Sequence, residues 1–167
     1  MKRVLITGLS GTGKSSLISE LASRGYKAVD TDRNPEWEER PDSGGGLGWL
    51  WREDRIKALL ETDDGEILFV SACVENQGKF YPLFDDIVLL IVPAEVTIQR
   101  LARRTNNPYG KRPDEVAEVL AYKATVEPLL RKSATIEIDA SRPLADVVEA
   151  LISALGLPKS RPWRPGS

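Results

Sequence analysis

The chain has 167 residues, of which 41% are hydrophobic and 29% charged, and its 23 basic and 25 acidic residues give a formal net charge of −2. These values describe one globular domain of ordinary size rather than a disordered tail. The near balance of charges excludes a broad basic surface that coats nucleic acid, because such a surface needs an excess of lysine and arginine.

Two residue counts exclude whole classes of chemistry. The chain contains no histidine, which removes Ser-His-Asp hydrolysis and every site in which histidine acts as a base or a metal ligand. Cys73 is the single cysteine, so neither an internal disulfide nor a cysteine-rich zinc site can form. The chemistry must therefore use carboxylates, lysine, arginine, hydroxyl groups, backbone amides or a metal held by oxygen.

The apolar runs are too short for a membrane. The longest covers residues 87–92, whereas a membrane-spanning helix needs about 20 apolar residues. The N-terminal apolar run meets a glycine at Gly8 and has no signal-peptide core. We therefore expect a cytoplasmic protein without a membrane partner.

Strands and helices alternate along the chain. Short apolar runs predict strands at 3–7, 26–29, 67–72, 87–92 and 135–139. Helical spacing of apolar residues predicts helices at 14–24, 49–61, 93–104, 113–132 (kinked at Pro128) and 143–155. Residues 33–48 are rich in proline, glycine and charge, which predicts a loop. This alternation is typical of a parallel sheet covered by helices on both faces, so we expect an α/β fold.

The strongest motif is GLSGTGKS at residues 8–15. It matches G-x-x-x-x-G-K-[ST] and lies between a predicted strand and a predicted helix, which is the context that this phosphate-binding loop requires. Glycines let the backbone amides surround phosphate oxygens, and the helix that follows adds the positive end of its dipole. In such a loop, Lys14 reaches the β- and γ-phosphates and Ser15 holds Mg²⁺.

A second motif, Asp30-Thr31-Asp32, ends the second predicted strand. Two carboxylates at i and i+2 point to the same side of an extended chain, and in a parallel sheet this end of a strand faces the ligand crevice. One carboxylate near Mg²⁺ and one near an acceptor hydroxyl is an arrangement that suits phosphoryl transfer. The alternative is a turn with two solvated acids.

On these residues, the chain over about 2–155 resembles the small P-loop kinases, the group of nucleoside monophosphate, shikimate and gluconate kinases. The resemblance implies a three-layer α/β/α fold with a five-stranded parallel sheet of order 2-3-1-4-5. It implies one domain at 1–157, with an acceptor-binding segment at 33–62 and a lid at 104–113, and then a basic, proline-rich tail at 158–167. The implied activity is transfer of the γ-phosphoryl group of Mg²⁺–ATP to a small metabolite or nucleotide.

The resemblance also implies roles for individual residues. Arg100 and Arg104 are four apart and share one face of a helix; in related kinases the first arginine lies against the adenine and the second meets the phosphates. The implied catalytic residues are Lys14, Asp32 and Arg104, and the implied metal-binding residues are Ser15, Asp30 and Asp32. The nucleotide is expected to contact Gly8, Ser10, Gly11, Thr12, Gly13, Lys14, Ser15, Ser16, Arg100, Arg104 and Arg142. The alternative for the arginines is a solvated basic helix end.

The acceptor is left open by the sequence. Asp32, Arg52, Arg55 and Asn76 are the expected acceptor contacts, and the two arginines lie three apart on one predicted helix face. Shikimate kinases have Gly-Gly-Gly after the third strand, where this chain has residues 73–77, CVENQ. Shikimate itself is therefore in doubt as the acceptor.

Functions other than that of a kinase fit the sequence less well. A GTPase switch is disfavoured, because no D-x-x-G follows a strand and no N-K-x-D occurs. Two alternatives stay open: an accessory protein that binds or hydrolyses ATP without a small-molecule acceptor, and a kinase that acts on a nucleic-acid end. The acidic balance disfavours nucleic acid as a partner, and the oligomeric state is not indicated.

Overall fold

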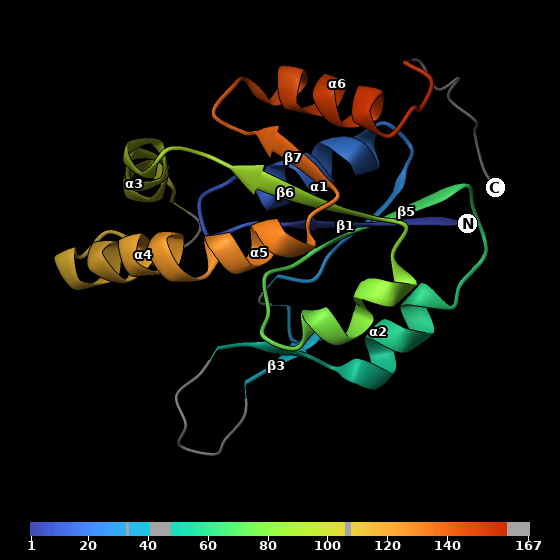
Figure 1. The fold of residues 1–167 in the computed structure, drawn as a ribbon, viewed down its shortest axis with the longest axis horizontal. Helices are drawn as coiled ribbons and strands as arrows, with labels where there is room; N and C mark the ends of the chain where they lie inside the picture. The colour runs from blue at the N-terminus through green and yellow to red at the C-terminus, as the bar shows by residue number, and fades with distance from the viewer. Residues whose placement is uncertain (33, 41–47, 106–107, 160–167) are drawn as a thin grey trace.

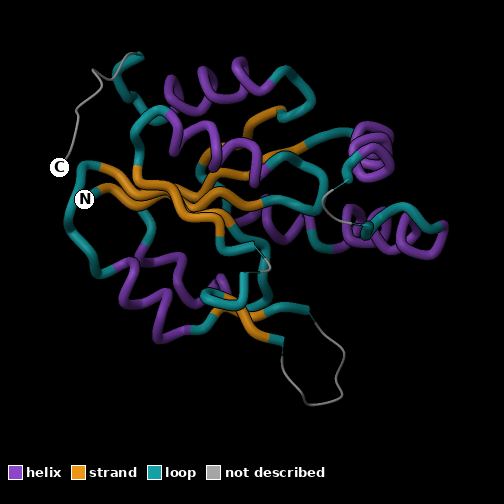
Figure 2. Tube along the Cα trace, turned by 180° about the vertical axis from the view of Figure 1, so that it is seen from behind, coloured by secondary structure: helices purple, strands orange, loops and turns teal. Residues whose placement is uncertain are grey.

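The computed structural model describes residues 1–32, 34–40, 48–105 and 108–159. A central sheet is covered by helices on both faces (Figures 1 and 2). Its strands are β1 (Lys2–Thr7), β2 (Lys27–Asp30), β5 (Ile67–Ser71), β6 (Asp86–Ile91) and β7 (Ile136–Asp139). They lie in the order β2-β5-β1-β6-β7, and each neighbouring pair is parallel. Numbered by their place among these five strands, this is the predicted order 2-3-1-4-5, which is confirmed.

The helices are α1 (Lys14–Ser23), α2 (Glu53–Leu60), the 3-10 helix η1 (Gln77–Leu83), α3 (Ala94–Arg103), α4 (Pro113–Thr125), α5 (Glu127–Ser133) and α6 (Leu144–Ala154). Helices α1 and α6 cover one face of the sheet, whereas α2, η1 and α5 lie against the other (Figure 1). The sheet therefore has a hydrophobic core on each face, the first under α1 and α6 and the second under α2 and η1. Successive strand residues point to opposite faces, so Val4 and Ile6 enter the first core and Leu5 enters the second. Strands that are buried on both faces are apolar throughout, which is why they were recognisable in the sequence.

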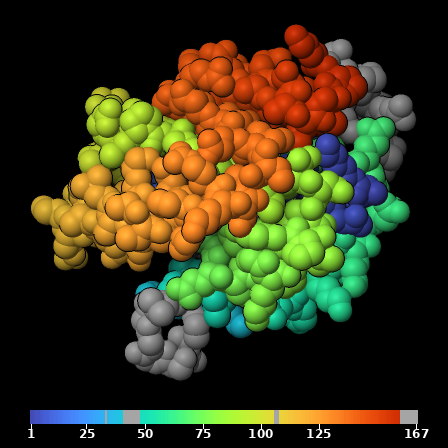
Figure 3. Space-filling model, viewed as in Figure 1, coloured from blue at the N-terminus to red at the C-terminus, as the bar shows by residue number. Residues whose placement is uncertain are grey.

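All five strands of this sheet point the same way, so their carboxyl ends meet at one edge. Ile6 is in register with Ser71 and Thr7 with Leu89, which brings the loops after β1, β5 and β6 together. Helices α3 and α4 lie beyond this edge (Figure 1), and α4 projects at the left of the space-filling view (Figure 3). Ligands of open parallel sheets bind at such an edge.

Two of the predicted helices differ in the structure. Residues 49–61 are not one helix: Leu50–Trp51 form β4, which pairs antiparallel with β3 (Glu38–Glu39), and α2 starts only at Glu53. The predicted helix 113–132 is broken between α4 and α5 at Val126, two residues before Pro128. Proline has no N–H to donate to the carbonyl four residues earlier, so the ladder cannot run through this point.

No helix within the part of the chain that the structure describes combines the length and the apolar character that crossing a bilayer would require.

Candidate functional site

The glycine-rich loop connects β1 to α1 and has the backbone that its motif predicts. Gly11 and Gly13 have φ angles of +81° and +93°, which side chains rarely adopt. At Gly8 the constraint is space: a Cβ there would lie 2.8 Å from the carbonyl oxygen of Leu90 and 2.9 Å from Thr12 Oγ1. The loop is therefore curled tightly over the end of β6, and its glycines are structural necessities.

Lys14 lies at the centre of this loop. Its side chain is almost fully buried, and its Nζ donates to the carbonyl oxygens of Gly8 at 2.6 Å and Leu9 at 3.1 Å. Thr12 Oγ1 donates to the same Leu9 carbonyl at 2.8 Å. The ammonium is thus held beside the N-terminus of α1, where its charge adds to the positive end of the helix dipole.

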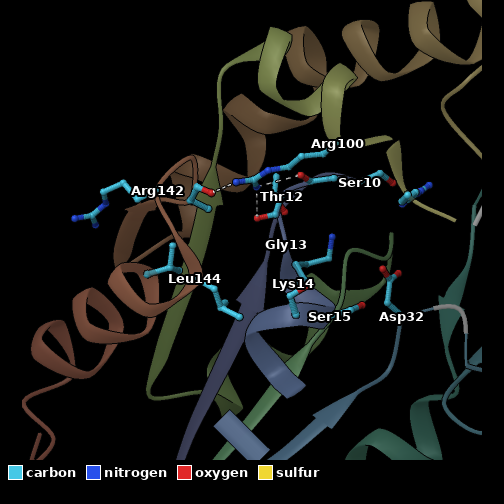
Figure 4. Close-up of a pocket in the computed structure, with 14 residues that line it drawn as sticks. Ser10, Thr12, Gly13, Lys14, Ser15, Asp32, Arg100, Arg142 and Leu144 are labelled. Carbon is cyan, nitrogen blue, oxygen red and sulfur yellow. Dashed lines mark hydrogen bonds between the residues drawn. The ribbon is translucent and has the colours of Figure 1, made fainter. Parts of the chain in front are cut away.

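A pocket of about 540 Å³ opens at this loop (Figure 4). It is lined by Ser10, Gly11, Thr12, Gly13, Lys14, Ser15, Ser16, Asp32, Arg100, Arg104, Ala140, Arg142, Leu144 and Val147. Lys14 and Asp32 point into the same space in Figure 4. Except for Gly8, the first residue of the loop, every residue expected to contact the nucleotide lines this pocket. One lysine and three arginines give it the positive potential that a polyphosphate requires.

Arg100 links two walls of the pocket. Its Nη2 donates to the carbonyl oxygen of Ala140 at 2.6 Å, and its Nη1 lies 3.4 Å from the carbonyl oxygens of Gly11 and Thr12 (Figure 4). The guanidinium fork can make these contacts together because its donors are fixed in one plane. Arg100 therefore fixes the glycine-rich loop relative to the turn after β7.

The predicted lid, 104–113, follows α3, and residues 106–107 lie outside the described residues. Arg104 lines the pocket and donates from Nη2 to the carbonyl oxygen of Tyr109 at 2.9 Å. The Tyr109 hydroxyl donates to Glu118 Oε1 at 2.6 Å, which anchors the segment to α4. Gly110 lies directly on Leu101 of α3. These contacts hold Arg104 at the pocket from the lid side.

The turn after β7 forms the opposite wall. Asp139 Oδ1 accepts hydrogen bonds from Ser141 Oγ at 2.5 Å and from Ser141 N at 2.9 Å. These bonds hold the pKa of the Asp139 carboxyl below its usual value, the hydroxyl contributing more than the amide. The turn places Arg142 on the pocket. Sequence reasoning missed the residues that α6 contributes to this wall, Leu144 and Val147; the signal available was a large apolar residue, Leu144, at the first position of α6.

The two carboxylates of the Asp30-Thr31-Asp32 segment have different surroundings. Asp32 lines the pocket, whereas Asp30 Oδ1 accepts hydrogen bonds from Asp32 N and Ser71 Oγ, both at 3.0 Å. The described residues contain no group of three or more acidic or cysteine side chains that would hold a metal by themselves. A hydroxyl at Ser15 and a carboxylate at Asp32 fit Mg²⁺, which usually takes one or two protein oxygens and completes its shell with phosphate and water.

The other expected acceptor contacts do not line the pocket. Arg52 Nε donates to the carbonyl oxygen of Pro35 at 2.9 Å, and its Nη1 lies 3.3 Å from Glu39 Oε2. Arg55 is exposed on α2. The expected pair of arginines on one helix face is not formed, because α2 begins after Arg52, which is its N-cap.

Asn76 has a different structural task. Its Oδ1 accepts from Trp51 N at 2.8 Å and its Nδ2 donates to the Trp51 carbonyl oxygen at 3.0 Å. The side-chain amide therefore pairs with β4 as a further strand would. Arg33, which adjoins Asp32, lies outside the described residues.

Cys73 follows β5 by two residues and lies close enough to Lys14 and Asp32 to feel their charges. Burial raises the pKa of its thiol, the positive charge of Lys14 opposes this, and the negative charge of Asp32 adds to it. Such a thiol stays protonated near neutral pH, so it does not behave as a nucleophile.

Comparison with known proteins gives results of two kinds. A family model described as "AAA domain" matches residues 4–121. The chain is 30% identical over 150 residues to the shikimate kinase of Mycobacterium avium, an alignment that covers 84% of this chain and 85% of that protein. Both the family model and this relative match most of the chain.

Solved structures share the fold. The shikimate kinase of Bacteroides thetaiotaomicron superposes with a TM-score of 0.67 at 18% identity, covering 93% of this chain and 99% of that one. A gluconokinase of Sinorhizobium meliloti gives a TM-score of 0.57 at 20% identity, with 93% and 91% covered. Both neighbours are kinases whose names give different acceptors, so the fold agrees while the acceptor is not indicated by it.

Proposed function

We infer the reaction of the chain from its family and its pocket. The chain belongs to the small P-loop kinase family and is a phosphotransferase. We propose that it transfers the γ-phosphoryl group of Mg²⁺–ATP to a small metabolite or nucleotide bound beside Asp32. The observation that carries this proposal is one pocket lined by Lys14, Asp32, Arg100 and Arg104 together. These residues come from α1, the end of β2 and the α3–lid region, and the fold brings them to one edge of the sheet.

The nucleotide would bind with its phosphates on the glycine-rich loop. The amides of residues 10–16 and the N-terminus of α1 attract negative charge, and Lys14 lies at the centre of the loop. The apolar side chains of Leu144 and Val147 would face the base, with Arg100 and Arg142 beside it. The chain contains no N-K-x-D, the motif that binds guanine, which supports ATP over GTP.

The residues of the site fit a divalent ion at Ser15 and Asp32, with Asp30 as an outer support. When bound, Mg²⁺ would offset the negative charge of the phosphate oxygens. Asp32 would accept a hydrogen bond from the acceptor hydroxyl and receive its proton as the new bond forms. Arg104 would stabilise the charge on the moving phosphoryl group, and the lid would exclude water.

These proposed residue roles require no histidine. Phosphoryl transfer depends mainly on positioning and on charge stabilisation, and lysine, arginine and carboxylate side chains supply both. We assign residues 1–157 to one kinase domain, residues 33–62 to the acceptor side and 104–113 to the lid. A cytoplasmic location suits an ATP-dependent enzyme of this type.

A panel of acceptors tests the proposal. ADP release from Mg²⁺–ATP is measured with sugar acids, nucleosides, nucleoside monophosphates, shikimate and 5′-hydroxyl oligonucleotides. We expect one small-molecule class to accelerate release. Uniform slow hydrolysis would indicate an accessory ATPase instead, and stimulation by oligonucleotides alone would indicate an end-directed kinase.

Two variants separate the roles within the site. Lys14→Ala is expected to abolish turnover, whereas Lys132→Ala, which removes an exposed lysine from α5, is the matched control that retains it. Asp32→Asn is expected to lower kcat by about 100-fold or more with little change in nucleotide affinity. Full turnover in the Lys14→Ala variant would disprove the proposed use of the pocket.

A further inference from the structure

A chain of hydrogen bonds reaches the Asp30-Thr31-Asp32 segment from the second core. Asn76 binds both backbone groups of Trp51, and the indole Nε1 of Trp51 donates to Thr31 Oγ1 at 2.8 Å. Trp51 is 1% exposed and Thr31 is fully buried. A buried donor or acceptor that loses its partner costs free energy. These bonds therefore hold Asn76, Trp51 and Thr31 in a single arrangement.

Thr31 is held from the other side by β5. Its N and Oγ1 both donate to the carbonyl oxygen of Ser71, at 3.2 Å and 2.7 Å. Ser71 Oγ in turn donates to Asp30 Oδ1, the oxygen that also accepts from Asp32 N. Thr31 therefore joins the end of β5 to the indole of Trp51, and Asp32 follows it directly in the chain.

The Trp51 ring is itself firmly packed. It meets Phe80 edge-on at a centroid distance of 5.5 Å and Phe84 at 6.4 Å. Tryptophan combines a large apolar ring with a hydrogen-bond donor: here the ring fills the core under η1, and the indole N–H donates to the buried hydroxyl of Thr31.

We propose that Trp51 is a positioning residue for phosphoryl transfer: through Thr31 its indole N–H fixes where the Asp32 carboxylate stands in the pocket, without touching a substrate. The inference rests on the proposed role of Asp32. A displacement of about 1 Å at a reacting group can lower a rate by 100-fold, so a hydrogen bond one residue away matters. It also gives Asn76, first expected to contact the acceptor, the role of holding Trp51.

The test compares three variants with a control. Trp51→Phe keeps an aromatic ring and removes the donor, while Thr31 Oγ1 keeps its bond to Ser71. Thr31→Val removes the hydroxyl, whereas Thr31→Ser retains the hydroxyl and removes only the methyl group. Phe84→Leu disturbs the packing of the same ring but leaves the indole N–H in place, so it controls for a loss of core stability.

The first readout is the amide signal of Asp32 in ¹H–¹⁵N NMR spectra of each full-length variant, which needs no acceptor. We expect this signal to move in Trp51→Phe and Thr31→Val and to stay at its wild-type position in Thr31→Ser and Phe84→Leu. The amides of Gly13 and Lys14 should not move in any of them. An unchanged Asp32 signal in Trp51→Phe overturns the proposal.

The second readout is kinetic and uses the acceptor that the panel identifies. Trp51→Phe is expected to lower kcat about tenfold, in line with one disturbed hydrogen bond, with KM for ATP unchanged. Added to Asp32→Asn, it should lower kcat no further, because both changes act on one carboxylate. Additive losses contradict the positioning role, whereas a normal kcat in Asp32→Asn alone contradicts the proposed function instead.

Discussion

Nη2 of Arg100 donates a hydrogen bond of 2.6 Å to the backbone carbonyl of Ala140, which ties α3 to the turn after β7. The same guanidinium reaches the carbonyl oxygens of Gly11 and Thr12. One side chain therefore sets the separation between the loop that would hold phosphate and the turn that would border the base. The width of the pocket therefore depends on this bridge.

Arg100→Lys is expected to weaken ADP binding roughly tenfold, because an ammonium cannot donate along the two directions that the guanidinium fork uses. Isothermal titration calorimetry measures the change. Arg103→Ala, which removes an exposed arginine of the same helix, is expected to bind ADP as the wild type does. Equal affinities of Arg100→Lys and the wild type would show that the bridge does not shape the pocket.

The Asp139–Ser141 turn predicts a pH dependence. Because the hydrogen bond from the Ser141 hydroxyl lowers the pKa of Asp139, the ionised carboxylate stabilises the turn above the usual pKa of aspartate, about 3.9. This stabilisation is lost as the pH falls through the lowered value. Ser141→Ala should raise the pKa of Asp139 toward its ordinary value. Carboxyl ¹³C chemical shifts followed against pH measure it, and an unchanged titration would refute the assignment.

Features that depend on local pattern were predictable from the sequence. The GLSGTGKS loop is recognisable because its glycines, lysine and serine lie at fixed spacing within eight residues, and the inner strands β1, β5 and β6 are mostly apolar because both of their faces are buried. Arg100 and Arg104 were indicated by their spacing of four and by the resemblance to the lid of related kinases, although α3 ends at Arg103 and Arg104 is its C-cap in extended conformation. Residues 10–15 of the loop and both arginines line the pocket in the structure.

Features that depend on pairing across the chain were not predictable. The helical spacing of apolar residues at 49–61 concealed β4, whose residues are set by Asn76 and by pairing with β3. Asn76 itself was assigned to the acceptor because a polar residue after a strand usually faces the crevice; its bonds to Trp51 became visible only in three dimensions. A short strand gains its stability from partners that local propensity does not reveal.

Cys73 is expected to react slowly with thiol reagents in the native protein. Burial raises the pKa of its thiol, so only a small fraction is thiolate at pH 8, and the thiolate is the reactive form. The rate of reaction with Ellman's reagent should rise at least about tenfold in denaturant, where the pKa returns toward 8.5. A native rate equal to the denatured rate would contradict both the burial and the raised pKa.

Leu101 lies between the lid and the glycine-rich loop, and Gly110 is the point where this packing is tightest. A Cβ at Gly110 would lie 2.7 Å from Leu101 Cδ1 and 3.0 Å from its Cβ, and the φ angle there is +91°. Leu101 has no free space to move into, since it is fully buried and packs against Gly11, where an added Cβ would lie 3.2 Å from its Cγ; any shift of Leu101 therefore presses on the glycine-rich loop. Gly110→Ala should therefore destabilise the fold by about 2–4 kcal/mol, from left-handed backbone strain and overpacking together.

Gly156→Ala is the matched control for this prediction. Gly156 also has a positive φ, +67°, but among the described residues no atom other than those of its chain neighbours lies within 4 Å of the added Cβ. The Gly156→Ala variant should lose only the stability that backbone strain accounts for, about 1–2 kcal/mol, and should bind ADP normally. Gly110→Ala should also bind ADP more weakly, because a displaced Leu101 presses on Gly11. Urea denaturation and calorimetry measure the two effects, and equal losses of stability with equal ADP affinity in both variants would show that Leu101 does not couple the lid to the loop.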